Sequence, residues 1–141
     1  HSQVPDFTIG KGVTLEHGTD VALLSVGNML SVAKEVSTRL RKFGISPCLV
    51  SLHTIKPLDD DLLSQLFLDC KKVVVIEEHG LAGGAGSAIL EWANAKEVDA
   101  SKVVCFGVKD AFLTACGSQE EARCLLKLDA DSIISSVQEY F

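Results

Sequence analysis

The residue types best suited to chemistry gather in one stretch, between a short apolar run and a helical pattern. Glu77, Glu78 and His79 follow residues 73–76, a β-branched run typical of a buried strand. The loop after them contains four glycines: Gly80, Gly83, Gly84 and Gly86. In open α/β sheets, ligand and catalytic sites lie at the carboxyl ends of the strands. The stretch therefore predicts a functional surface at that edge of a sheet.

A histidine follows a second apolar run and could approach the acidic pair. His53 comes directly after residues 48–52, and a His–Glu pair with Glu77 would suit a general base or an interface hydrogen bond. Adjacent residues leaving a strand point in different directions, so Glu77, Glu78 and His79 are poorly placed to converge on one atom. We therefore expect these residues, with His53 and Lys56, to form an inter-domain surface, with acid–base catalysis as the alternative.

The glycine loop raises the question of phosphate binding, because glycines before a helix expose N–H groups to an anion. A dinucleotide fingerprint needs a third glycine after Gly84 and Gly86, and a P-loop needs a lysine before Ser87; both are missing. The neighbouring carboxylates would also repel a phosphate. We expect instead that Gly83, Gly84 and Gly86 allow a helix or a partner domain to pack closely, with anion binding as the alternative.

Other reactive residue types fit structural roles. Ser87 lacks the flanking glycines of a nucleophile elbow. Asp59, Asp60 and Asp61 open a helical pattern, so we expect a helix cap and no metal site. Five cysteines without a C-x-x-C pair indicate free thiols in a reducing, cytoplasmic setting: Cys48, Cys70, Cys105, Cys116 and Cys124. All except Cys116 lie in apolar-periodic segments, where a thiol acts as a small hydrophobe.

The composition limits the class of protein. The chain has 141 residues, 47% of them apolar, and a net charge of −6, which argues against non-specific nucleic-acid binding. No apolar run approaches the about 18 residues of a membrane span, and no signal peptide is apparent. The chain starts with His1, which we expect to be an exposed loop residue. This start suggests a fragment of a longer protein or the remnant of a tag. We expect one domain over residues 1–141, with residues 1–18 as a leading segment and edge strand.

Strand and helix patterns alternate along the chain. Apolar runs typical of buried strands cover residues 21–26, 48–52, 73–76 and 103–108, and helical patterns cover residues 29–43, 59–70 and the segment from 85. Two short helices follow, one starting with a capping box from Ser118 to Glu121 and one capped by Asp129. We expect the two short helices and the helix over residues 29–43 each to bury one apolar side. The apolar residues expected there include Phe43, Ala122, Leu125, Leu126 and Phe141. This alternation predicts a mainly parallel sheet covered on both faces.

Four segments in order resemble a known family: GTDVALLSVGNML (18–30), GISPCLVSLHTIKPLD (44–59), KVVVIEEHGLAGGAGSAI (72–89) and FGVKDAFLTACGSQEEARCLLKLDADSI (106–133). Together they resemble the C-terminal domain of transketolase-like thiamine-diphosphate enzymes. That group includes transketolase, 1-deoxyxylulose-5-phosphate synthase and the beta subunits of 2-oxoacid dehydrogenases. The resemblance runs from about Phe7 to the end and is greater to the first two groups. Lys127 and Leu128 depart from it, since the family often has glycine before the LDA sequence.

The resemblance implies a three-layer α/β/α fold with a five-stranded, mostly parallel sheet and one antiparallel edge strand, at residues 13–16. It also implies that thiamine diphosphate and magnesium bind the complete enzyme between two other domains. The Gly-Asp-Gly motif that starts their site is absent here, and Asn28 and Asn94 are too far apart to form its paired end. The resemblance therefore assigns no catalytic, cofactor-binding or metal residue to this chain.

The function implied is a supporting one. The complete enzyme would transfer a two-carbon ketol unit between sugar phosphates, and this domain would pack against the cofactor-binding domains of the same chain or a separate subunit. It would also shape a homodimer, without contact with nucleic acid or membrane, and the isolated chain would be inactive. The alternative is a free-standing module that binds a small anion or a protein and catalyses nothing.

Overall fold

A computed structural model describes residues 7–114 and 116–141, so the first six residues of the leading segment, His1 included, lie outside the described residues. Five strands form one sheet in the order β1-β3-β2-β4-β5. Their bounds are β1 Val13–Glu16, β2 Val21–Ser25, β3 Pro47–Ser51, β4 Lys72–Gly80 and β5 Val103–Val108. β1 pairs antiparallel with β3, and all other pairs are parallel. The predicted mostly parallel sheet with an antiparallel edge strand is confirmed.

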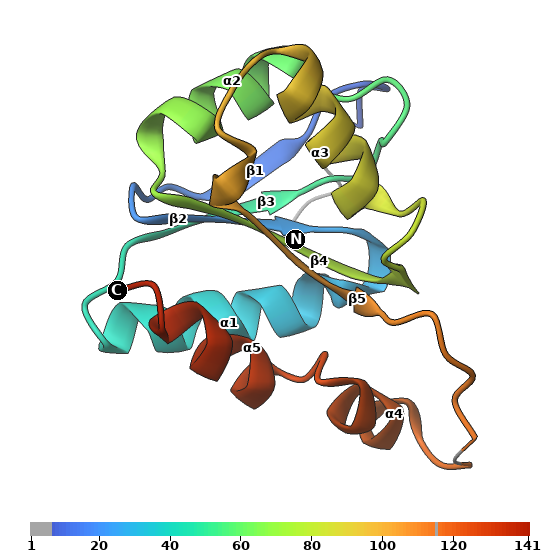
Figure 1. Ribbon diagram of the computed structural model, residues 1–141. Helices are drawn as coiled ribbons and strands as arrows, with labels where there is room; N and C mark the ends of the chain where they lie inside the picture. The colour runs from blue at the N-terminus through green and yellow to red at the C-terminus, as the bar shows by residue number, and fades with distance from the viewer. Residues whose placement is uncertain (1–6, 115) are drawn as a thin grey trace.

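Helices cover both faces of this sheet and make three layers (Figure 1). One face carries α2 (Asp60–Asp69) and α3 (Ala85–Ala95). The other carries α1 (Leu30–Lys42) and α5 (Ala130–Gln138), with α4 (Gln119–Leu126) beyond them. Two single 3-10 turns, η1 (Gly27–Met29) and η2 (Ala100–Lys102), precede α1 and β5. The α/β/α arrangement expected from the alternating patterns is therefore present.

The central strand shows why these runs form buried strands. All of β2 is buried, and its side chains alternate between two cores. Val21 and Leu23 pack towards α1 and α5, whereas Ala22 and Leu24 pack towards α2 and α3. Side chains of a strand alternate between its two faces, so a strand covered on both sides needs an unbroken apolar run.

The predicted helix starts are confirmed. The side chains of Asp59, Ser118 and Asp129 accept hydrogen bonds from backbone N–H groups at the starts of α2, α4 and α5. At α4 the full capping box is present, because the Glu121 carboxylate also accepts from the Ser118 N–H at 2.7 Å. These contacts satisfy N–H groups that have no partner within the helix.

Several predicted burials are wrong. Phe43 is 61% exposed because it caps α1 one residue before Gly44, beyond the last buried turn. Phe141 follows the end of α5 and is 46% exposed. α4 contains no fully buried residue, and Leu125 on it is 62% exposed. An apolar stripe shows which side a helix would bury, but here α4 stands away from the sheet.

The cysteine thiols differ in how far they are buried. Cys48 and Cys70 are buried, Cys105 is half-buried, and Cys124 is exposed, contrary to its expected place in an apolar segment. Burial raises the pKa of Cys70 to about 11, so this thiol is protonated and unreactive at neutral pH. Over the described residues, none of the helices has the length and apolar character needed to cross a bilayer.

Candidate functional site at the carboxyl edge of the sheet

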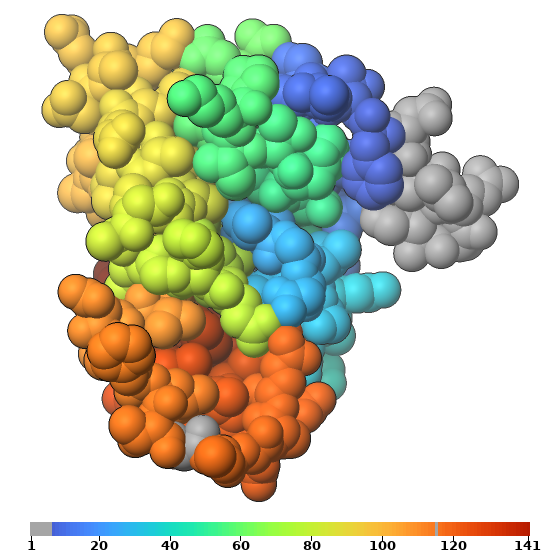
Figure 2. Space-filling view, turned by 90° about the vertical axis from the view of Figure 1, so that its right-hand side faces the viewer, coloured from blue at the N-terminus to red at the C-terminus, as the bar shows by residue number. Residues whose placement is uncertain are grey.

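The polar segments singled out in the sequence meet at one edge of the sheet. β2, β3, β4 and β5 are mutually parallel, so the segments after them emerge on the same side, which faces the viewer in Figure 2. These segments are residues 26–29, 52–59, 81–84 and 109–114, and the last residues of β4, 77–80, lie at the same edge. We call this side the carboxyl edge.

Glu77 lies inside the domain, not on its surface. β4 continues to Gly80, past the Ile76 at which the sequence suggested an end, with an irregular register against β5 after Ile76. The Glu77 side chain is only 2% exposed and turns towards α3. Its two oxygens accept hydrogen bonds from the N–H groups of Ala85, at 2.7 Å, and Gly86, at 2.9 Å. The first turn of α3 is thus held by a carboxylate of this chain.

This contact bears directly on anion binding. A helix N-terminus attracts anions through its free N–H groups and its partial positive charge. Here Glu77 already supplies a negative group to both N–H donors. A phosphate would have to displace a buried side chain that completes the same bonds. The glycine loop therefore binds an internal carboxylate in place of an external one.

Glycine is favoured at positions 84 and 83 of the loop for different structural reasons. A Cβ on Gly84 would lie 2.5–2.6 Å from the Glu77 carboxylate oxygens and the Gly80 carbonyl oxygen, which is closer than packing allows. Gly83 has φ of +78°, a conformation that favours glycine, although a Cβ there would meet nothing. The Gly83 N–H donates to the Ser87 hydroxyl oxygen at 3.0 Å. The Ser87 hydroxyl donates to the Leu81 carbonyl at 2.7 Å, so this serine closes the loop.

Glu78 joins three elements at the same edge. Its carboxylate accepts from Arg123 Nε at 2.9 Å and Nη2 at 3.3 Å, and from Gln119 Nε2 at 2.8 Å. The Asn28 amide, on η1, also donates to it. The Arg123 guanidinium, with further help from these amides, holds the pKa of Glu78 below its usual value. Only 25% of the Glu78 side chain and 11% of the Arg123 side chain are exposed.

Arg123 and Gln119 did not emerge from the sequence as site residues. The one available signal was the acidic pair itself, because two adjacent carboxylates at a buried strand end need nearby donors. Which donors supply them depends on the packing of α4, which no local pattern specifies.

Among the described residues, the contacts of His53 and His79 are to groups other than the acidic pair. His53 follows β3 and Glu77 lies on β4, and β2 runs between those strands. The predicted His53–Glu77 pair is therefore not formed: His53 Nδ1 lies 3.0 Å from the Thr54 hydroxyl, and its ring meets Phe7 edge-on at 4.8 Å. His79 is exposed, with Nδ1 3.0 Å from the Gly80 carbonyl oxygen. Lys56 is exposed on the loop after β3.

The triple aspartate also has structural contacts. Asp59 is buried and accepts from the Gly12 and Leu62 N–H groups, and the Lys11 ammonium bridges Asp59 and Asp61 at 3.0 Å each. Asp60 accepts from the Trp92 indole at 2.7 Å, which ties α2 to α3. In residues 7–114 and 116–141, no three His, Cys, Asp or Glu side chains gather into a metal-binding group.

Comparison with known proteins gives consistent similarities. Residues 10–133 match the family model described as transketolase, C-terminal domain. The chain is 38% identical over 128 residues to the 1-deoxy-D-xylulose-5-phosphate synthase of Halothermothrix orenii, covering 91% of this chain and 20% of that protein. It is 35% identical to the same enzyme of Psychromonas ingrahamii, covering 100% and 22%. The chain thus spans about a fifth of the length of these relatives.

A solved structure shares the fold at similar identity. A split gene transketolase, described as an inactive beta4 tetramer, superposes with a TM-score of 0.83 and 32% identity. The match covers 94% of this chain and 43% of that one.

Proposed function

The chain belongs to the family of transketolase C-terminal domains, and we propose that it acts as the domain of a larger thiamine-diphosphate enzyme that does not itself hold the cofactor. We propose that residues 1–141 form one such domain, with residues 1–18 as its leading segment and edge strand. Its role is to pack against the cofactor-binding domains and to shape a dimer of the complete enzyme. Thiamine diphosphate and magnesium bind those other domains.

One observation carries this proposal above the others. Glu77 fills the N–H groups of the glycine loop, the feature of this chain that most resembles an anion site. The buried carboxylate supports a structural role for the carboxyl edge, and it speaks against the alternative of a free-standing small-anion module. The exposed part of that edge offers a packing surface instead: Lys56, His79 and Gly83, with the half-buried His53 and Glu78 and the buried Gly84 and Gly86 behind them.

We propose that the complete enzyme transfers a two-carbon ketol unit between sugar phosphates. A second candidate is supported by the curated relatives, which are 1-deoxy-D-xylulose-5-phosphate synthases. The product in that name has five carbons and a methyl ketone, so it would join a two-carbon acetyl unit to a three-carbon aldose phosphate. Both reactions add a two-carbon carbanion to an aldehyde, and the cofactor supplies the stabilisation of that carbanion. The residues of this chain take no covalent part in either.

The test compares the isolated chain with the complete enzyme. A ligand that binds only the folded state at 100 times its dissociation constant adds about 2.7 kcal/mol to stability. For a chain of this size, that raises the melting temperature by about 5–10 °C. We expect no shift of the isolated chain with millimolar thiamine diphosphate and magnesium, and no product from xylulose 5-phosphate or a 2-oxoacid.

The complete enzyme should show a shift and should form one of the two products with an aldose phosphate acceptor. The product identifies the reaction, because 1-deoxyxylulose 5-phosphate lacks the hydroxyl that ketol transfer leaves on the first carbon. A saturable shift of the isolated chain would contradict the proposal and would return the cofactor site to this domain.

A further inference from the structure

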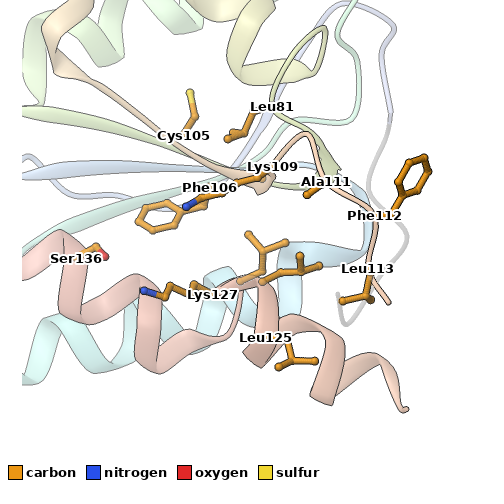
Figure 3. Close-up of a pocket in the computed structure, with 13 residues that line it drawn as sticks. Leu81, Cys105, Phe106, Lys109, Ala111, Phe112, Leu113, Leu125, Lys127 and Ser136 are labelled. Carbon is orange, nitrogen blue, oxygen red and sulfur yellow. The ribbon is translucent and has the colours of Figure 1, made fainter. Parts of the chain in front are cut away.

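An apolar cavity opens beside the carboxyl edge, beneath α4. It has a volume of about 380 Å³ and lies between β5, loop 109–114 and the end of α4 (Figure 3). Its walls are mainly Leu81, Phe106, Leu113, Leu125, Leu126 and Leu128. In the space-filling view, the orange segments of the loop and α4 surround a hollow on this side (Figure 2). A cavity of this size can accept a large side chain.

The cavity exists because polar contacts hold α4 away from the sheet. The link runs from Glu78, at the end of β4, to Arg123 and Gln119 on α4. α4 itself has no fully buried residue; Leu126 packs partly buried against the core, and the cavity remains open beside it. The Glu78 contacts thus keep an opening that a closer approach of α4 would remove.

Large apolar side chains at its mouth face outward. Phe112 is 98% exposed, and its ring points away from the cavity in Figure 3, while Leu125 is 62% exposed. Neighbouring exposed apolar residues beside a concave apolar surface are typical of an interaction site. These side chains would lose contact with water if a partner covered the cavity.

Two lysines lie in the wall of the cavity, in a chain of net charge −6. Lys109 and Lys127 both line it, and neither forms an ion pair with any residue that the structure describes. Lys127 is the C-cap of α4 in the left-handed conformation, which fixes the position of its backbone. A fitting occupant therefore combines an apolar group with a nearby negative charge.

We propose that this cavity receives a large apolar side chain, flanked by a carboxylate, from the cofactor-binding part of the same enzyme. The inference rests on the proposed function. The curated relatives are about five times as long as this chain, so most of the enzyme that could cover the cavity lies outside it. The cavity is continuous with the carboxyl edge, so a single partner surface can cover both. Lys109 and Lys127 supply the charge that selects an acidic neighbour.

The test is site-specific photocrosslinking in the complete enzyme. Phe112→p-benzoylphenylalanine places the reactive group at the mouth, and peptide mass spectrometry identifies the product. Leu68→p-benzoylphenylalanine is the matched control, because Leu68 is 79% exposed on α2, on the other face of the sheet. We expect crosslinks from position 112 to cofactor-binding segments, and none to those segments from position 68.

A second pair of variants tests the contact itself. Adding Leu125→Asp should lower the crosslink yield at position 112 at least several-fold, whereas Leu68→Asp should leave it unchanged. A yield unaffected by Leu125→Asp, a crosslink from position 112 to a second copy of this domain, or no crosslink would overturn the inference. Saturable loss of the crosslink on adding octanoate at constant enzyme assembly would assign the cavity to a small amphipathic acid and would overturn it too. Failure of the proposed function would appear separately, as a complete enzyme without thiamine-diphosphate-dependent activity.

Discussion

Replacing Glu77 should destabilise the chain more than any surface glutamate does. Its carboxylate is 2% exposed and accepts two backbone hydrogen bonds from the first turn of α3. Glu77→Gln keeps the volume but offers one oxygen and one NH₂ group. The oxygen can accept from one of the two N–H groups, and the NH₂ group then faces the other donor. The variant thus loses one charge-assisted bond and leaves a buried N–H without an acceptor.

The magnitude follows from those two losses. A hydrogen bond to a charged group contributes about 1.5–3 kcal/mol, and an unsatisfied buried donor costs about 1–3 kcal/mol. These figures describe overlapping effects, so we expect Glu77→Gln to lower the free energy of unfolding by about 2–4 kcal/mol. Glu77→Ala leaves both donors without an acceptor and adds a cavity, so it should cost more. With a urea m-value of about 2 kcal/mol/M, the Gln variant should unfold at about 1–2 M lower urea.

Equilibrium urea unfolding, followed by circular dichroism, measures this difference. The matched control is Glu91→Gln, an exposed glutamate on α3, the helix that Glu77 holds, and it should change stability by less than about 0.5 kcal/mol. Formate should raise the midpoint of Glu77→Ala more than that of the wild type, because it can occupy the freed N–H groups. Equal midpoints for Glu77→Gln and Glu91→Gln would refute the reasoning. If formate raised the wild-type midpoint as much as that of Glu77→Ala, the N–H groups at the start of α3 would be open to anions in the wild type.

Two further predictions concern α4. Ser118→Ala removes the N-cap of the capping box and should lower the free energy of unfolding by about 1 kcal/mol, with Ser136→Ala on α5 as a comparison; an unchanged urea midpoint would contradict it. The Glu78 pKa is lowered in the folded state, chiefly by Arg123, so this contact stabilises the chain above about pH 4.3, the ordinary glutamate value, and the gain is lost as pH falls through the folded pKa. The difference in unfolding free energy between wild type and Arg123→Met should therefore be constant from pH 7 to about 5 and shrink below that. A difference that grows towards acid pH would show that the ion pair is not the source of the stabilisation.

Structural features that depend only on residues close together in the chain could be predicted from the sequence. The fully buried β2 follows from an unbroken apolar run. The caps at Asp59, Ser118 and Asp129 follow from a side-chain oxygen and an N–H three residues later. Such contacts close within one helical turn, so the residue types alone specify them.

Features set by strand order were not predictable from the residues. His53 and Glu77 each follow a strong apolar run, and the sequence does not say that β2 separates those runs in the sheet. The end of β4 was also placed too early, because charged residues are rarely buried in a strand. Burial of Glu77 is favourable here because the N–H groups of Ala85 and Gly86, eight and nine residues further on, donate hydrogen bonds to its carboxylate. The resemblance to a family gave the sheet type, but it did not give these contacts.

The position of α4 also depends on contacts between distant elements, and these contacts bear on function. Its apolar stripe predicts a buried side, yet Leu125 is 62% exposed, and α4 is attached to the end of β4 through the Arg123–Glu78 contact. Glu77 turns inward to hold α3, and Glu78 turns towards α4, so two adjacent carboxylates fix the elements on opposite faces of the sheet. Both carboxylates are thus engaged in positioning, which leaves neither of them free for acid–base chemistry. The carboxyl edge thus combines two internally bonded carboxylates with an apolar cavity beside them, an arrangement that supports the packing role proposed above.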